Sequence, residues 1–154
     1  MSNEFRIING IVFDPTNEIE GKVCDIFVKD GKIVSKVSKA AKVIDAKGMA
    51  VMPGGVDIHC HITGPKVNLA RKLLPEDHRL DPPFTTPHTH SGPGGLVPST
   101  FATGYRYATL GYTTAMEAAV PPLTARHALE EMYDTPLIDN GFSVLRGNNL
   151  FFQS

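Results

Sequence analysis

Residues 53–61 read Pro-Gly-Gly-Val-Asp-Ile-His-Cys-His, and this stretch decides how the rest of the chain is interpreted. A turn-forming run precedes a short apolar strand that ends in a His-x-His pair. Because side chains alternate across a strand, Asp57, His59 and His61 are predicted to share one face, with the residues between them on the other. Two imidazoles held on one face of a stiff strand can bind a single zinc ion. We therefore predict that His59 and His61 are metal ligands; the alternative is two polar residues at a strand end.

The composition is that of an ordinary globular protein. The chain has 154 residues, a net charge of −1 and 42% hydrophobic residues, which is unlike a disordered or membrane protein. The near-neutral charge gives no reason to expect a nucleic acid or an anionic lipid surface as a partner. Cys24 and Cys60 lie far apart, no secretory pattern precedes them, and no stretch approaches the roughly 20 apolar residues of a spanning helix. We therefore expect a cytoplasmic protein with no membrane partner.

Residues 1–52 are predicted to form a small β platform. Three glycine-containing dipeptides, Asn9-Gly10, Asp30-Gly31 and Lys47-Gly48, each separate two β-rich runs. Such turns tolerate positive φ, so each dipeptide is predicted to close a hairpin. Three strand pairs make a small sheet or sandwich, and no residue in this segment suggests chemistry.

The segment after the His-x-His strand, residues 63–98, is predicted to be a long loop. It holds seven prolines and three more histidines, His78, His88 and His90, with little periodicity. A loop of this length is commonly functional or disordered, and this one leaves from the end of the metal strand. We therefore expect it to lie over the site. His88-Thr89-His90 repeats the His-x-His pattern. We interpret it as part of the loop, and a metal-ligand role is the less favoured alternative.

Regular structure returns after Ser99 in repeated βα order. A helix, a strand, a second helix and a third strand are predicted at 100–110, 112–116, 125–133 and 142–145. With the His-x-His strand first, this order is typical of a parallel sheet with right-handed crossovers. A complete eight-fold barrel takes about 250 residues. The predicted fold class is therefore α/β: a β-sandwich-like domain over 1–52, then the first βα units of a truncated metal-dependent hydrolase TIM barrel over 53–154.

A few single residues are assigned from their positions. Asp57 is predicted to orient an imidazole by a hydrogen bond. Glu117 ends a strand on the side where barrel chemistry gathers, so it is a candidate for lining the site. Cys60 is predicted to pack beneath a crossover helix, and His127 is expected on a helix surface. The basic cluster at 66–72 is interpreted as solvated surface, with an anion or a subunit interface as the alternative.

These motifs together resemble a known family. Residues 51–61 resemble the metal strand of the amidohydrolase superfamily. Further motifs narrow the resemblance to the A-subunit family of formylmethanofuran dehydrogenases, together with the hydrolase subunit of the bacterial formyltransferase/hydrolase complexes. The narrowing motifs are Gly64-Pro65-Lys66-Val67-Asn68, Gly111-Tyr112-Thr113-Thr114-Ala115 and Gly147-Asn148-Asn149.

The resemblance implies a metal-dependent amidohydrolase with two zinc ions at the mouth of a βα barrel, one of them bound by His59 and His61. The family's bridging carboxylated lysine, further histidines and acid/base aspartate would lie beyond Ser154, so the catalytic residues are unknown from this chain. Lys66 and Asn68 are candidates for shaping the pocket. The implied reaction is hydrolysis or formation of the linear N-formyl amide of formylmethanofuran, in a complex with other subunits.

Two other functions stay open on the residues alone. The His-x-His strand is shared with dihydroorotases and hydantoinases, which act on cyclic amides. The other alternative is a non-catalytic module that docks partner subunits through its β platform and loop.

Overall fold

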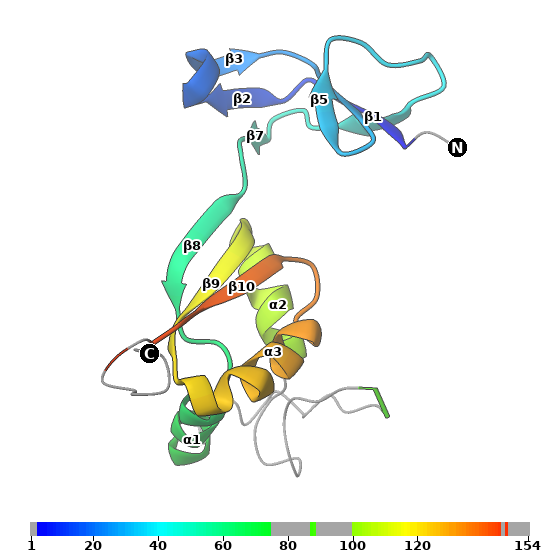
Figure 1. The fold of residues 1–154 in the computed structure, drawn as a ribbon. Coiled ribbons are helices and arrows are strands. Elements are labelled where there is room, and N and C mark those ends of the chain that lie inside the picture. Colours follow the sequence, from blue (N-terminus) through cyan, green and yellow to red (C-terminus); the bar gives the residue numbers. More distant parts are fainter. Residues whose placement is uncertain (1–2, 75–86, 89–99, 146, 148–154) are drawn as a thin grey trace. The chain divides into compact units, whose positions relative to one another are not determined.

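The computed structural model describes residues 3–74, 87–88, 100–145 and 147 (Figure 1). The chain divides into two compact units, Met1–Pro53 and Gly54–Ser154. Within the described ranges, no helix is long and apolar enough to cross a membrane.

The first unit consists of two small sheets. In the first sheet the strand order is β5-β4-β1-β6, and in the second it is β3-β2-β7. Each sheet combines antiparallel pairing with one parallel pair, β1 with β6 and β2 with β7. The elements are β1 (Glu4–Ile8), β2 (Ile11–Asp14), a 3₁₀ turn (Pro15–Asn17), β3 (Ile19–Val23), β4 (Ile26–Lys29), β5 (Lys32–Val34), β6 (Lys42–Asp45) and β7 (Ala50–Val51).

Only one of the three predicted hairpins exists. Asp30-Gly31 joins the antiparallel strands β4 and β5, and both turn residues have positive φ, 50° and 77°, as a tight hairpin requires. Asn9-Gly10 and Lys47-Gly48 instead carry the chain from one sheet to the other, so those two hairpin predictions are wrong. The Asn9-Gly10 connection packs closely against β7 instead of turning back as a hairpin. Gly10 is buried, and a Cβ there would lie 2.6 Å from a methyl carbon of Val51.

The second unit is a parallel sheet with helices between its strands, in the order β10-β9-β8 (Figure 1). Its elements are β8 (Gly55–Cys60), α1 (Pro65–Leu73), α2 (Thr100–Thr109), β9 (Tyr112–Val120), a 3₁₀ turn (Pro122–Thr124), α3 (Ala125–Tyr133) and β10 (Asp139–Val144). The repeated βα order is the one predicted from the sequence. The fold class, a β-rich segment followed by βα units, is therefore confirmed.

Helix α1 corrects the predicted long loop, because it occupies residues 65–73 of that segment. Pro65 is the first helical residue, where its missing N–H costs nothing and its fixed φ suits the helix. His88 lies in an exposed turn. Most of the rest of the predicted loop, including His78 and His90, lies outside the described residues.

The core of the second unit lies between the sheet and α2. Cys60, Ile62, Ala115 and Ile138 form a buried cluster, and Tyr107 and Ala108 of α2 pack against it. Cys60 thus packs beneath a crossover helix, as predicted. Burial raises the pKa of the Cys60 thiol to about 11, so at neutral pH this cysteine is a packed apolar residue rather than a thiolate.

Helix α2 approaches the segment before β10 so closely that Gly104 has no room for a side chain. A Cβ at this position would overlap the backbone carbonyl oxygen of Pro136. We expect Gly104→Ala to lower the free energy of unfolding by about 1–2 kcal/mol. Because the clash is with backbone atoms, the overpacking cost is expected in the upper part of the roughly 1–3 kcal/mol range, and it outweighs the gain of about 1 kcal/mol in helix propensity. Urea unfolding measures the change.

Thr109→Ala, at the exposed end of the same helix, is the control and is expected to change stability by less than about 0.5 kcal/mol. A Gly104→Ala variant as stable as the parent would show that α2 does not make this close approach.

Candidate metal centre

The two histidines of the His-x-His pair stand together at the carboxyl end of β8. Their ring centroids are 5.5 Å apart and the ring planes meet at 82°. Both residues are exposed, the His61 side chain to 46%. The rings are therefore neither splayed apart nor packed against hydrocarbon.

The pair does not form a complete metal shell within the part of the chain that the structure describes. There, no third His, Cys, Asp or Glu joins the two imidazoles in a ligand cluster. Even a catalytic zinc site normally has three protein ligands. Any complete site therefore needs at least one ligand beyond His59 and His61.

A buried carboxylate on the neighbouring strand holds the His61 ring and the backbone beside it. Glu117 of β9 is only 2% exposed, and its Oε1 lies 3.0 Å from Nδ1 of His61. Its Oε2 accepts the backbone N–H groups of Ile62, at 2.5 Å, and Thr63, at 3.0 Å. With Nδ1 donating to Glu117, the lone pair of Nε2 is left for a ligand, the usual arrangement of a metal-binding histidine. The structure thus brings Glu117 to the site.

Asp57 lies elsewhere than the alternation rule predicted. Its Oδ2 accepts the hydroxyl of Tyr107 on α2, at 3.0 Å, and its Oδ1 accepts the backbone N–H of His59, at 3.1 Å. The predicted shared face is wrong, because the pairing register of β8 shifts between Asp57 and Cys60. Among the described residues, Asp57 bonds the backbone of His59 and the Tyr107 hydroxyl, and it makes no hydrogen bond to an imidazole ring.

A second buried carboxylate, which the sequence analysis missed, holds the start of α1. Glu131 of α3 is fully buried, and its Oε2 accepts the backbone N–H of Gly64 at 2.5 Å. Its Oε1 accepts Nδ2 of Asn68 at 2.5 Å and lies 3.2 Å from Nε2 of His127. The available signal was a glutamate on the apolar stripe of a helix, beside Ala128 and Met132.

The side chains of Asn68 and Arg71 point into the protein, and their hydrogen bonds attach α1 to the rest of the second unit. Asn68 is 6% exposed and donates to Glu131, and it is not among the residues that line the pocket described below, so a part in shaping that pocket stays a prediction. The Arg71 guanidinium donates to the carbonyl oxygen of Ile62 at 3.0 Å and to Oγ1 of Thr103 at 3.3 Å. Burial lowers the pKa of Arg71, and the charge of Glu131 acts in the opposite direction. Arg71 is therefore not part of a solvated basic surface.

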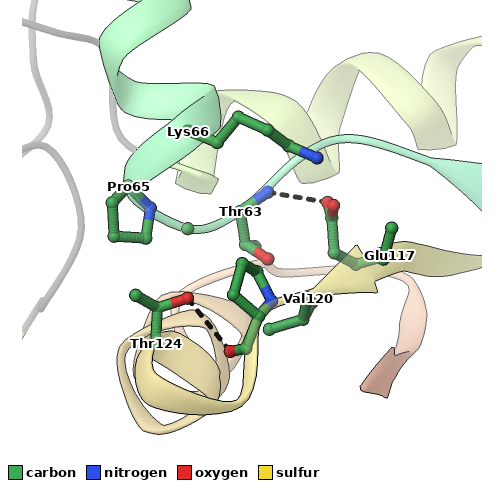
Figure 2. Close-up of a pocket in the computed structure, with 9 residues that line it drawn as sticks. Thr63, Pro65, Lys66, Glu117, Val120 and Thr124 are labelled. Atoms are coloured by element: carbon green, nitrogen blue, oxygen red, sulfur yellow. Dashed lines mark hydrogen bonds between the residues drawn. The ribbon is translucent and has the colours of Figure 1, made fainter. Parts of the chain in front are cut away.

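A small pocket of about 100 Å³ lies between the α1 start and the end of β9 (Figure 2). Lys66 reaches along it towards Glu117, and within the described residues it makes no ion pair. Thr63 is 3% exposed, and its Oγ1 has no hydrogen-bond partner among the described groups. The pocket is lined by Thr63, Gly64, Pro65, Lys66, Glu117, Ala119, Val120, Pro121 and Thr124. Because Glu117 also contacts His61, the pocket and the histidine pair share one wall.

Comparison with known proteins gives closely related sequences and one close structure. The family model described as "Amidohydrolase family" matches residues 42–149. Protein FwdA of Methanocaldococcus jannaschii is 53% identical over 95% of this chain, and the A subunit of the formyltransferase/hydrolase complex Fhc of Methylorubrum extorquens is 39% identical over 94%. The crystal structure of that FhcABCD complex with methylofuran matches 96% of this chain with a TM-score of 0.77 and 38% identity. The chain spans about a quarter, 26%, of the length of each of these proteins.

The buried Glu131 carboxylate gives a stability prediction. We expect Glu131→Gln to lower the free energy of unfolding by about 2–4 kcal/mol. The new amide would direct a donor at a group that is itself a donor, either the N–H of Gly64 or Nδ2 of Asn68. Flipping Asn68 to compensate would turn its amide nitrogen towards Arg71. Denaturant unfolding of the 154-residue chain provides the measurement.

Glu130→Gln on the same helix is the matched control. Glu130 pairs with Arg126 at an exposed i,i+4 position, so its loss is expected to cost less than about 0.5 kcal/mol. Equal effects of the two substitutions would mean that Glu131 does not anchor α1.

Proposed function

Since the chain belongs to the amidohydrolase family, we propose that it is the metal-strand portion of the A subunit of a formylmethanofuran dehydrogenase or of the related formyltransferase/hydrolase complex. The observation that carries the proposal is the facing pair His59 and His61, backed by buried Glu117. It occurs in a chain that is 53% identical to FwdA over nearly all of its length. Residues 1–52 are then the β platform of that protein, and 53–154 the start of its barrel.

The residues present fit a zinc ion. His59 and His61 are exposed imidazoles close enough to share one ion, and Glu117 is placed to fix the Nδ1–H of His61. In this proposal, three further groups come from chain outside these 154 residues: the remaining ligands of the first zinc, the ligands of a second zinc, and the acid/base group. When bound, zinc lowers the pKa of water towards about 7 and polarises a carbonyl group, which a poorly electrophilic amide needs.

The chain's own residues have separable tasks in this reaction. His59 and His61 bind the ion, and Glu117 and Glu131 hold the backbone that follows them. The reaction consumes one water and breaks the C–N bond of an N-formyl amide, giving formate and the free amine, and the reverse direction forms the amide. We assign the small pocket beside Lys66 to the formyl end of the substrate, because about 100 Å³ admits only a few heavy atoms.

The same assignment names partners and a location. The Methylorubrum relative belongs to a complex crystallised with methylofuran, and we propose that this chain likewise acts with other subunits on formylmethanofuran. A cytoplasmic location follows from this role and agrees with Cys24 and Cys60 being free thiols.

A chimera tests the proposal. This chain replaces the matching 146-residue segment of Methanocaldococcus FwdA, and the assembled complex is assayed for hydrolysis of formylmethanofuran. We expect the chimera to retain activity, and His59→Ala or His61→Ala to lower its zinc content and reduce the rate at least about 10³-fold, because a metal ligand is lost.

His127→Ala, which alters a histidine on α3, serves as the control and is expected to keep the zinc content of the chimera unchanged. Hydrolysis of dihydroorotate in place of the formamide would instead indicate a cyclic-amide hydrolase. Full zinc content in both strand variants would favour a non-catalytic docking module.

The isolated 154-residue chain should bind zinc weakly and should not hydrolyse formylmethanofuran, because two histidines alone cannot complete a zinc shell. Zinc titration by calorimetry and a formate-release assay check the two halves of this prediction. Turnover by the purified chain would contradict it.

A further inference from the structure

We propose that Asp57 is a positioning residue: together with Tyr107 of α2, it stabilises an irregularity in β8 that places His59 and His61 on the face of the strand opposite to α2. The inference rests on the proposed metal role of this pair, but it concerns the backbone that presents the rings. In this inference Asp57 acts by accepting the main-chain N–H of His59. It does not act by bonding an imidazole ring or by balancing the charge of the metal.

The register of β8 against β9 shifts twice, between Gly55 and Val56 and between Asp57 and Cys60, and the second shift is the irregularity that concerns the histidines. Asp57 pairs with Ala115, and Cys60 pairs with Glu117. Three steps along β8 therefore correspond to two steps along β9, which is the count of a β-bulge at residues 58–59. In a regular strand Asp57 and Cys60 would point to opposite faces, whereas here both side chains meet Tyr107 on the face covered by α2.

The bulge places the two histidines on the face of β8 that points away from α2. Cys60 is buried under α2 at 6% exposure, so its neighbours His59 and His61 alternate to the other side, where both are exposed. Ile58, the other residue of the bulge, is 79% exposed. Because of the extra residue, Asp57 faces α2 while His59 and His61 face away from it.

The Asp57 carboxylate bridges this bulge. One oxygen accepts the N–H of His59, a group that a bulge removes from regular strand pairing, and the other accepts the Tyr107 hydroxyl. Tyr107 is itself fixed, since its ring contacts Tyr112 at a centroid distance of 5.4 Å and packs against the Cys60 cluster. Burial, followed by the bond to Asp57, raises the pKa of the Tyr107 hydroxyl, which keeps it a protonated donor.

Four variants of the 154-residue chain separate positioning from charge. Asp57→Ala removes the bridge, whereas Asp57→Asn keeps an oxygen for the N–H of His59 and places an amide N–H₂ opposite the Tyr107 oxygen. Tyr107→Phe removes only the hydroxyl. Tyr105→Phe is the matched control, because Tyr105 lies on the exposed side of the same helix.

Two readouts are measured for each variant. Zn²⁺ affinity is determined by titration with a competing chelator. Hydrogen exchange of the His59 amide is measured without metal. A thermal melt accompanies each variant, so that a general loss of stability is recognised separately.

A positioning role predicts at least tenfold weaker Zn²⁺ binding and at least tenfold faster His59 exchange for Asp57→Ala. Asp57→Asn and Tyr105→Phe should stay within about threefold of the parent, and Tyr107→Phe should lie between. The proposal is overturned if Asp57→Ala keeps affinity and exchange within threefold, or if Asp57→Asn binds as weakly as Asp57→Ala. If Asp57→Ala does not fold, unchanged exchange in Tyr107→Phe also overturns it.

Failure of the proposed metal function has a different signature. In that case the parent chain and the full chimera bind no Zn²⁺. The His59 exchange rates still decide whether Asp57 sets the strand geometry, because this readout does not need the metal.

Discussion

Two buried carboxylates that accept main-chain N–H groups are the constraint on which this site depends. Glu117 accepts the N–H groups of Ile62 and Thr63, and Glu131 accepts that of Gly64. A buried charge is tolerated only where donors satisfy it, so each carboxylate fixes the backbone around it as firmly as that backbone stabilises the charge. The turn directly after the histidine strand therefore has one conformation, in a position where a chain would otherwise be free to vary.

The parallel arrangement of the strands explains why these groups meet. The carboxyl ends of β8 and β9 lie at the same edge of the sheet, so Glu117, in the second half of β9, can reach the turn that follows β8. Helix α3 then brings Glu131 beneath the start of α1, with Asn68 between them. Rigid elements thus supply each member of the network, which is the arrangement that holds a binding site to a fixed geometry.

Particular residues show how far the sequence could lead. The pair His59 and His61 could be singled out because the His-x-His pattern and its apolar surroundings are local. Glu117 was singled out because the sequence predicted a strand end there, although β9 continues to Val120. Asp57 was assigned to the wrong face, since the alternation rule holds only for a regular strand and a bulge depends on the partner strand. Glu131 carried a local signal, a glutamate on an apolar helical stripe, but its partner Gly64 lies 67 residues away.

The sequence by itself determined the order of the elements, the helices α2 and α3, the parallel character of the second unit and the histidine pair, because hydrophobic periodicity and turn residues act within a few positions. Only the tertiary structure decided that β1 and β2 enter different sheets, that α1 forms inside a proline-rich segment, and which carboxylates hold the turn after the His-x-His strand. Each of these depends on burial and on contacts between distant residues. Gly10 fitting against Val51 and Asp57 meeting Tyr107 are examples, and no local pattern encodes either contact.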